Sequence, residues 1–411
     1  MNALSLRELR ALFRSNPTFR RVLLADLLSQ IGDGGILVAF PMLILEQTGD
    51  VTLTGLAFSG EVAAFALLSP LAGFVADRFE QRRVMIAADS ARVCFLALLL
   101  LVLAFHASFG ALLAASVAFG ASGAFFMPAR AAFMRRVLEG ADLERAIALE
   151  GTVAFLTRLI SPALMGLLLA ILPPVAGIAF DLVAYASAIV LLAPRWVRGT
   201  LSVEKAADEG AWQEGWLCIL RSVPLRSLLG LDLALCLVGM AAFSSSVAFL
   251  SEHLQLSAQS NCWLLAATGL TGALGTQLAG RLGRGGGTYA ALTGLVALTY
   301  LLVPHAHSLG VMVAMWGLRG FAYGALGVLI NQRIVQEAAP QVMGRVNAAW
   351  SLVACLAAFF GSASTPFLLR TIGSAQSFTL FGITLASAAI LMGAQVAARS
   401  AQARRTVEQP G

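Results

Sequence analysis

Asp33 is a carboxylate in the middle of an otherwise apolar run, residues 20–46. If this run crosses a lipid bilayer, a charged side chain at that depth costs about 2.5 to 3.5 kcal/mol and needs a partner or a function. Burial disfavours the charged form of a carboxyl group, so we predict that Asp33 binds and releases a proton. The alternative is a structural ion pair or hydrogen bond that fixes this segment, with Arg158 as a candidate partner.

Two more polar residues, Asp26 and Gln30, recur at helical spacing and share one face with Asp33. We therefore group all three as candidates for proton coupling or substrate binding. Neighbouring glycines would let the helix bend and let a backbone or a solute approach closely. They are Gly32, Gly34 and Gly35.

Further charged residues interrupt apolar runs elsewhere, and each is a candidate substrate or coupling residue. Asp181 could form a polar contact with Tyr185, which follows on the same helical face. The guanidinium of Arg319 could attract an anionic group, or pair with Asp232 or Asp181. The full set is Glu61, Arg158, Asp181 and Arg319.

Asp26 and Asp232 occupy matching positions near the starts of two apolar runs. Side-chain oxygens of aspartate often accept hydrogen bonds from the free backbone amides at a helix start. Hydrogen bonding of this kind is the simpler account of both residues.

The elements that must position these residues are membrane-spanning helices. Hydrophobic residues make up 58% of the chain and charged residues 12%, and the mean hydropathy of +0.82 is too apolar for a soluble globule. A helix of about 20 apolar residues spans a bilayer, and the runs lack the alternation of barrel strands. We predict twelve spans, at 20–46, 53–76, 84–105, 109–133, 148–171, 174–194, 226–251, 258–280, 288–304, 309–332, 345–369 and 374–397.

The net charge of +6 follows the topology of such a bundle. Basic residues cluster before the first span and in alternate connections after it, whereas Arg370 alone lies in an opposite connection. By the positive-inside rule, both termini are cytoplasmic. The distribution argues against nucleic acid as a partner and favours a multi-pass membrane protein.

The chain also divides into similar halves. A polar interval at about 195–225 separates six spans from six, which predicts an N-terminal bundle (1–194), a cytoplasmic linker, a C-terminal bundle (226–398) and a cytoplasmic tail (399–411). Weak matches between the halves share an offset of about 200 residues, so we predict two six-helix bundles related by a pseudo-twofold axis, with a cavity between them. The matches are Arg20-x5-Asp26 with Arg226-x5-Asp232, ADRFEQRR with AGRLGRGG, and RRVLE with QRIVQE.

The connection between the second and third spans carries the most specific motif, LAGFVADRFEQRR at 71–83. With SQIGDG at 29–34, MPARAAF at 127–133 and GRVNAAW at 344–350, it makes the chain resemble the major facilitator superfamily, within the bacterial exporter branch of siderophore and macrolide efflux proteins. The resemblance covers nearly the whole length. It implies an all-α membrane protein with twelve transmembrane helices in two six-helix bundles.

In this superfamily the loop after the second span latches the cytoplasmic side when the cavity faces outward. The resemblance therefore implies that Asp77 meets the positive end of a helix from the other bundle. For Arg82 and Arg83, a topology signal in the headgroup layer is an equal alternative. The implied gate residues are Gly73, Asp77, Arg78, Arg82 and Arg83.

Other family features bear on transport. Span ten lines the cavity in this superfamily, which places Arg319 near an anionic group of a substrate such as a carboxylate siderophore. Two departures weaken the likeness to proton antiporters: RLISPALMG at 158–166 lacks two of the expected glycines, and 113–126 lacks a basic residue.

The sequence holds no motif for an enzyme or an ATP-driven pump. The single lysine, Lys205, is followed by Ala206 and not by the Ser or Thr of a phosphate-binding loop. Four histidines and five scattered cysteines form no metal or disulfide pattern. We expect no cofactor, energy from the proton gradient, and a monomer.

We therefore predict a secondary active transporter that exports a small amphipathic solute, siderophore or drug-like, by alternating access and proton antiport. One alternative is an importer or a lipid or metabolite facilitator with the same fold. An alternative of another class is a membrane sensor or assembly partner that moves no solute.

Overall fold

Within the residues that the computed structural model describes, all secondary structure is helical, which confirms the predicted all-α class. At some positions inside helices, Asp77 among them, only the backbone is described. The described residues are 16–104, 108–138, 171–193, 212–256, 260–283, 285–338 and 342–407, with 146, 153, 157, 161, 164, 165, 168 and 169.

The chain forms two compact units. Unit 1 comprises Met1–Ala207 with Asn261–Ala266, and unit 2 comprises Asp208–Ser260 with Ala267–Gly411. The boundary between residues 207 and 208 lies in the polar interval at 195–225.

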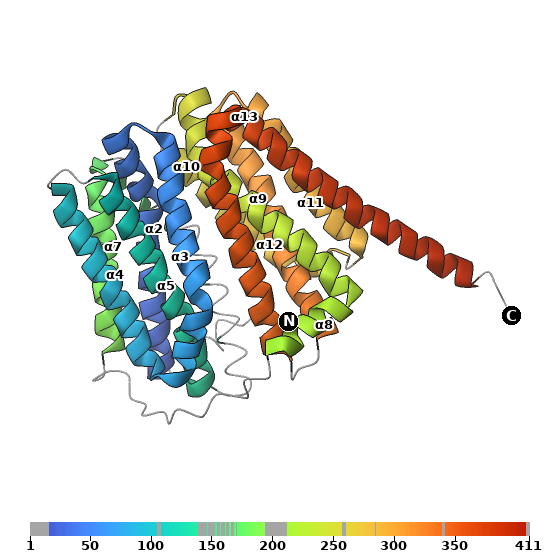
Figure 1. The fold of residues 1–411 in the computed structure, drawn as a ribbon, viewed down its shortest axis with the longest axis horizontal. Coiled ribbons are helices and arrows are strands. Elements are labelled where there is room, and N and C mark those ends of the chain that lie inside the picture. The colour runs from blue at the N-terminus through green and yellow to red at the C-terminus, as the bar shows by residue number, and fades with distance from the viewer. Residues whose placement is uncertain are drawn as a thin grey trace. The chain divides into compact units, whose positions relative to one another are not determined.

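Unit 1 is a bundle of long helices (Figure 1). Helix α2 packs against α7, and α5 packs against both α3 and α4. Gly49 ends α2 with a φ of 65°, a left-handed conformation that glycine adopts without strain. The described helices are α2 (Pro17–Thr48), α3 (Val51–Arg78), α4 (Gln81–Ala104), α5 (Phe109–Val137) and α7 (Val175–Leu192).

Unit 2 is organised around α9 and the long α13, which pack against each other. Helix α13 consists of two helices that meet at Gly373, where φ is 79° and ψ is 171°. Ser222 and Ser308 cap α9 and α12 by accepting hydrogen bonds from backbone amides three residues later. The helices are α8 (Trp212–Arg221), α9 (Val223–His253), α10 (Ser260–Leu278), α11 (Gly286–Leu302), α12 (Leu309–Glu337) and α13 (Met343–Val407), with 3-10 turns at Ala279–Arg281 and Val303–His305.

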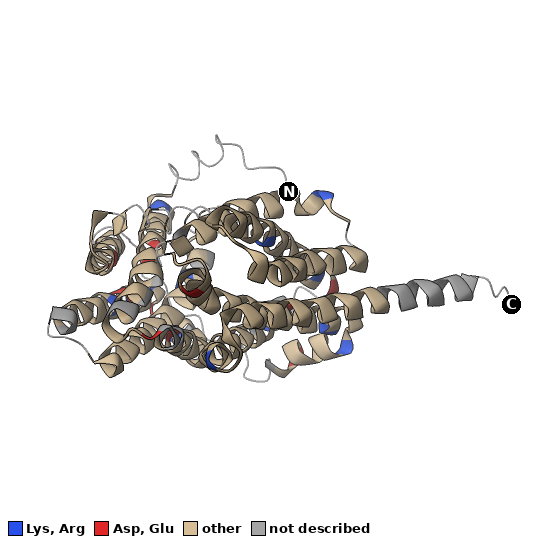
Figure 2. Cartoon of the chain, turned by 90° about the horizontal axis from the view of Figure 1, so that it is seen from above, with Lys and Arg blue, Asp and Glu red and all other residues tan. Residues whose placement is uncertain are grey.

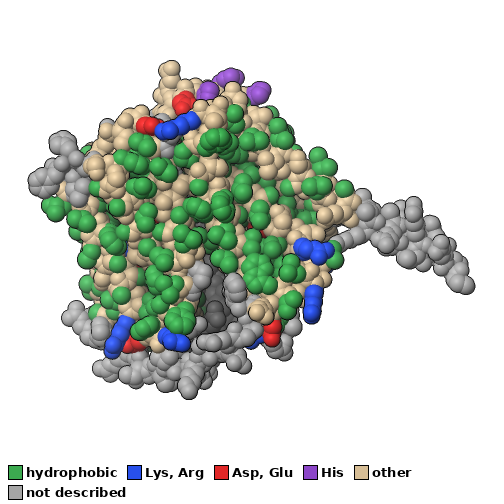
Figure 3. Space-filling view, viewed as in Figure 1, with side chains coloured by type: hydrophobic (Ala, Val, Ile, Leu, Met, Phe, Trp, Pro, Cys, Tyr) green, Lys and Arg blue, Asp and Glu red, His purple; other side chains and the backbone are tan. Residues whose placement is uncertain are grey.

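The helices suit a lipid environment. Among the described residues, eight helical segments are long and apolar enough to cross a membrane. Large apolar side chains remain exposed on them, including Ile171 (80%), Ile390 (70%) and Leu67 (69%). Hydrophobic side chains cover the helix flanks in Figure 3, and most of the visible charged and histidine side chains lie toward helix ends. Lipid tails, and not water, are the favourable contact for such a surface.

All predicted spans except one coincide with described helices, with boundaries that differ by a few residues. The exception, 148–171, is described only at isolated positions, so the count of twelve stays a prediction. The interval predicted as a linker contains helix α8, because Gly215 and Ile219 give it a buried face. The interval predicted as a tail continues α13 to Val407, since residues 399–407 contain no proline or glycine that would end the helix.

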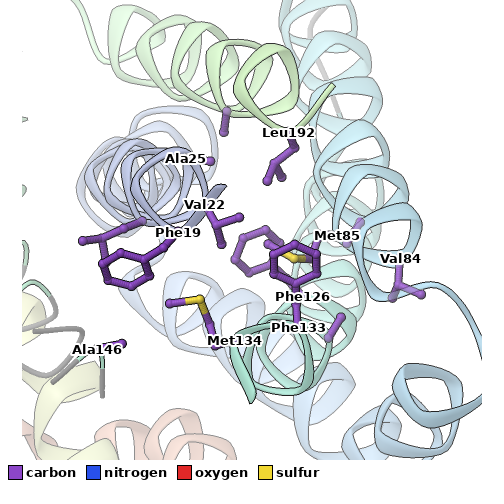
Figure 4. Close-up of a cluster of buried hydrophobic side chains, with 14 of the residues drawn as sticks. Phe19, Val22, Ala25, Val84, Met85, Phe126, Phe133, Met134, Ala146 and Leu192 are labelled. Carbon is purple, nitrogen blue, oxygen red and sulfur yellow. The ribbon is translucent and has the colours of Figure 1, made fainter. Parts of the chain in front are cut away.

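The core of unit 1 divides into two apolar clusters along α2. One contains Phe19 and Val22 of α2 with Met85, Phe126 and Phe133, whose side chains converge in Figure 4. The other cluster contains the α2 residues from Ile36 to Ile44 that face inward. The polar segment 26–35 therefore lies on α2 between two packed regions, which hold it in place.

Glycines bring α10 and α12 into close contact in unit 2. A Cβ atom on Gly324 would lie 2.1 Å from the carbonyl oxygen of Gly272, and one on Gly320 would lie 2.4 Å from that of Thr268. The Thr271 hydroxyl donates to the Gly317 carbonyl across the same contact at 2.6 Å. Small residues thus let these two helices pack closely, as they commonly do between helices in a membrane.

We expect Gly324→Val to destabilise unit 2 by about 2 kcal/mol, because the added side chain must push the two backbones apart. Thermal unfolding of the purified protein in detergent measures the effect. Gly327→Val is the matched control. Gly327 lies on the same helix, and a Cβ atom there would meet nothing within 4 Å. Equal loss of stability in both variants would mean that helix propensity, and not packing, accounts for the change.

Candidate functional site

Asp33 binds a tyrosine inside unit 1. Its carboxylate on α2 accepts a hydrogen bond from the hydroxyl of Tyr185 on α7. Tyr185 is fully buried and packs edge-on against Phe119 of α5, with ring centroids 6.0 Å apart. The predicted coupling carboxylate therefore has a defined partner on another helix. The alternative partner, Arg158, lies outside the described residues.

Arg92 of α4 is a buried cation that sequence analysis missed. Its Nη1 atom lies 3.3 Å from Oδ1 of Asp89, one turn earlier on the same helix. Its guanidinium also lies over the rings of Tyr185 and Phe119, at 5.0 and 5.3 Å from their centroids. The signal was present in the sequence, because opposite charges three residues apart inside an apolar run point to a buried pair.

Three carboxylates on three helices face this one cation. Arg92 interacts electrostatically with Asp33, Asp89 and Glu61, which lie on α2, α4 and α3. Asp89 also accepts a hydrogen bond from the Ser29 hydroxyl of α2 at 3.4 Å. Among the described residues of this cluster, one buried cation faces three carboxylates and cannot neutralise them all, so the cluster has the chemistry to take up and release a proton.

Asp26 and Gln30 belong to a second polar group on α2. Asp26 forms an ion pair with Arg130 of α5 and accepts a hydrogen bond from Nε2 of Gln30 at 2.7 Å. Gln30 in turn accepts from the Thr157 hydroxyl at 2.9 Å. The helix-start account of Asp26 is wrong, because its partners are side chains. Arg130 lies within α5, which continues to Val137.

Asp181 holds the backbone of α2. Its two carboxylate oxygens accept hydrogen bonds from the amides of Gly35 at 2.9 Å and Ile36 at 2.6 Å. A Cβ atom on Gly35 would lie 2.1 Å from Oδ1 of Asp181, so glycine is needed there. The predicted contact between Asp181 and Tyr185 is therefore not formed, because each binds a different part of α2. Asp181 fixes the segment that carries Asp33.

The arginines of the loop after α3 pair locally. Arg82 and Arg83 both contact Glu80, at 2.7 and 2.6 Å. The guanidinium of Arg78 lies 4.3 Å from the centroid of the Phe74 ring. These contacts order the connection between α3 and α4.

For Gly73 and Asp77, the other two residues of the motif, the structure describes no side-chain contact. A Cβ atom on Gly73 would meet nothing within 4 Å. The side chain of Asp77 lies outside the described residues. The predicted gate role of the motif therefore stays a prediction.

Unit 2 buries its own arginine and aspartate, and they do not meet. Arg319 of α12 donates from Nη1 to the Tyr300 hydroxyl at 3.1 Å and from Nη2 to the Thr268 hydroxyl at 3.5 Å. Asp232 of α9 accepts a hydrogen bond from Nε1 of Trp350 on α13 at 2.7 Å. The helix-start account of Asp232 is therefore wrong as well. Neither Asp232 nor Asp181 is the partner of Arg319 among the described contacts.

The two units thus consist of long apolar helices with a few charged residues, whose positions along the ribbon are coloured blue and red in Figure 2. Such a chain is a multi-pass membrane protein with polar groups buried between its helices. The Major Facilitator Superfamily model matches residues 22–362, so the chain belongs to this superfamily. Membership confirms the resemblance found in the sequence and the expectation of a transporter rather than an enzyme.

Curated relatives include two bacterial exporters. The chain is 27% identical over 346 residues to the multidrug efflux pump Tap of Mycobacterium tuberculosis, covering 79% of this chain and 80% of that protein. It is 27% identical over 356 residues to the enterobactin exporter EntS of Shigella boydii, covering 83% and 82%.

Solved structures share the fold at low sequence identity. The human organic anion transporter MFSD10 (TETRAN) matches with a TM-score of 0.67 and 18% identity, covering 92% of this chain and 99% of that one. A POT family transporter in complex with 5-aminolevulinic acid matches with a TM-score of 0.73 and 13% identity, covering 92% and 96%. These likenesses support the major facilitator fold alone.

Proposed function

We propose that this protein exports a small amphipathic solute, drug-like or siderophore, by alternating access in exchange for protons. The observation that carries the proposal is the buried cluster of unit 1, in which Asp33 binds Tyr185 and faces Arg92. A transporter driven by a proton gradient needs a membrane-buried group that gains and loses a proton, and in this proposal Asp33 is that group.

The direction of transport is supported by the relatives, whose names describe efflux and export. Drugs and siderophores are both small and amphipathic, so the two names agree on a class of solute. The family accounts for a bilayer environment and a small-molecule substrate.

The topology belongs to the same proposal. Both termini face the cytoplasm of a bacterial inner membrane, residues 1–194 and 226–398 form the two moving bundles, and the protein acts as a monomer. The motif after α3 acts as the cytoplasmic gate through Gly73, Asp77, Arg78, Arg82 and Arg83. The ion pairs of Arg82 and Arg83 with Glu80 support an ordered loop at that position.

Inside-out membrane vesicles test the proposal. Vesicles from cells that produce the chain are energised to acidify their interior, and uptake of ethidium and of iron-free enterobactin is followed. Export predicts uptake that collapses when the pH gradient is dissipated. Uptake only in right-side-out vesicles would identify an importer. No uptake of either probe, or of the acid-bearing dye fluorescein, in either orientation would favour the sensor alternative and contradict the proposal.

A further inference from the structure

Arg319 is a buried cation that pairs with no carboxylate among the described residues of its own unit. The residue is 6% exposed, and both of its hydrogen-bond acceptors, the hydroxyls of Tyr300 and Thr268, are neutral. Its guanidinium lies 4.5 Å from the ring centroid of Trp316 and 5.6 Å from that of Tyr300. A buried charge is stabilised mainly by an opposite charge, and none of these groups carries one.

Every described carboxylate of unit 2 is engaged elsewhere. Glu214 pairs with Arg345 and Glu337 pairs with Arg333. The other two accept hydrogen bonds from neutral side chains, Glu252 from Ser374 and Asp232 from Trp350. No carboxylate among the described residues of this unit therefore remains to neutralise Arg319.

The hydrogen-bond donors around Arg319 that lack acceptors are arranged to suit a carboxylate. Within the described part of the chain, its Nε atom is buried without a hydrogen-bond partner, and its Nη2 atom makes one contact, of 3.5 Å, to Thr268. Nε and Nη2 share the edge of the guanidinium that binds the two oxygens of a carboxylate side by side. Nε1 of Trp316, whose ring lies against the guanidinium, is a second buried donor without an acceptor.

We infer that Arg319 and Trp316 form a subsite for a carboxylate group of the transported solute. The inference rests on the proposed function and narrows its substrate class to acid-bearing amphipathic molecules. The carboxylate takes the free edge of the guanidinium, replaces the long contact to Thr268, and lies within reach of the Trp316 indole. The neighbouring aromatic rings of Tyr300 and Phe378 suit an apolar or aromatic body attached to the acid.

Calorimetry on the purified full-length protein in nanodiscs tests the subsite. The probes are benzoate, its neutral analogue benzamide, and chloride. We expect benzoate to bind saturably, benzamide not to bind, and Arg319→Gln to weaken benzoate binding at least about tenfold. Arg333→Gln is the matched control on the same helix, because Arg333 pairs with Glu337 and should leave binding unchanged.

Two results would overturn the subsite. One is that Arg319→Gln binds benzoate with wild-type affinity. The other is that chloride binds as tightly as benzoate and displaces it, which would make the site a halide site. If Arg319→Gln does not fold, Thr268→Asp replaces it, since an internal carboxylate beside Nη2 should abolish benzoate binding. Undiminished benzoate binding in Thr268→Asp would equally contradict the inference.

Transport into inside-out vesicles then distinguishes two ligands of the subsite: the carboxylate group of a transported solute, and a free carboxylate ion that binds without being transported. Fluorescein and its neutral ester are the probes. We expect Arg319→Gln to reduce fluorescein uptake at least about tenfold relative to the ester. If benzoate binds but Arg319→Gln lowers the uptake of fluorescein and its ester equally, the subsite binds a free carboxylate ion. The inference that the transported solutes carry an acid would then be wrong. If the wild type moves no probe, the proposed function fails, whereas calorimetry still decides the Arg319 site.

Discussion

Asp33→Asn is expected to abolish proton-driven export while leaving the protein folded. Asparagine has nearly the same shape and keeps an oxygen that accepts the hydrogen bond from Tyr185, so the contact between α2 and α7 is preserved. It cannot carry a proton on and off. Energised uptake into inside-out vesicles should fall to the level of vesicles that lack the protein.

The surroundings of Asp33 make it the carboxylate best placed for this role. It faces Tyr185 and Asp181 on α7, Arg92 on α4, Glu61 on α3 and Asp26 on its own helix. Asp26 has its own cation in Arg130, and the Asp181 oxygens are held by backbone amides. Among the described residues, the hydrogen-bond donor to Asp33 is the neutral hydroxyl of Tyr185.

Exchange of solute across vesicles without a pH gradient separates coupling from binding. Asp33→Asn should retain this exchange, because the substitution removes the proton and not the path. Asp232→Asn is the matched control in unit 2, since the new amide still accepts from Trp350 and its energised uptake should stay near wild type. Full gradient-driven uptake in Asp33→Asn would remove Asp33 from the mechanism.

The fold was largely predictable because a bilayer imposes simple rules on sequence. Helix length follows from membrane thickness, so long apolar runs identified α2, α9 and α12 within a few residues. The limits of α8 and the end of α13 were less predictable, because they depend on tertiary contacts and helix propensity. Gly215 packs against the backbone of Arg345, which no local pattern reveals.

The candidate site was predictable residue by residue but not in its pairings. A charge inside an apolar run is visible in the sequence, and Asp33, Asp181 and Arg319 were identified in this way. Their partners depend on the rotation of each helix about its axis and on the relative depth of the side chains in the bundle. Neither can be predicted from a single apolar run of the sequence. Asp181 therefore binds the backbone of α2, although helical spacing on α7 favoured Tyr185. Arg92 and Asp89 were not predicted as a pair because they lie near the start of their span, close to loop arginines that serve as topology signals.

Arg92→Met is expected to cause the largest loss of stability in unit 1. Asp89 would remain buried without its cation, and breaking a buried ion pair in this way costs about 3–5 kcal/mol. The stacking of the guanidinium on Tyr185 and Phe119 would be lost as well. Thermal unfolding in detergent should show a clear decrease. Arg345→Met is the control, because its pair with Glu214 is partly exposed and worth no more than about 1 kcal/mol.

The double variant Asp89→Asn/Arg92→Met distinguishes a structural role of Arg92 from a functional one. Removing both charges no longer leaves the Asp89 carboxylate buried without its cation, so the stability lost through that broken pair should return. Gradient-driven uptake should nevertheless stay impaired, because Arg92 is the cation that faces Asp33 and Glu61. Recovery of both stability and uptake would mean that Arg92 serves only to neutralise Asp89. Stability without uptake would place Arg92 in the proton-coupling cluster, since the chain would then be folded yet unable to use the gradient.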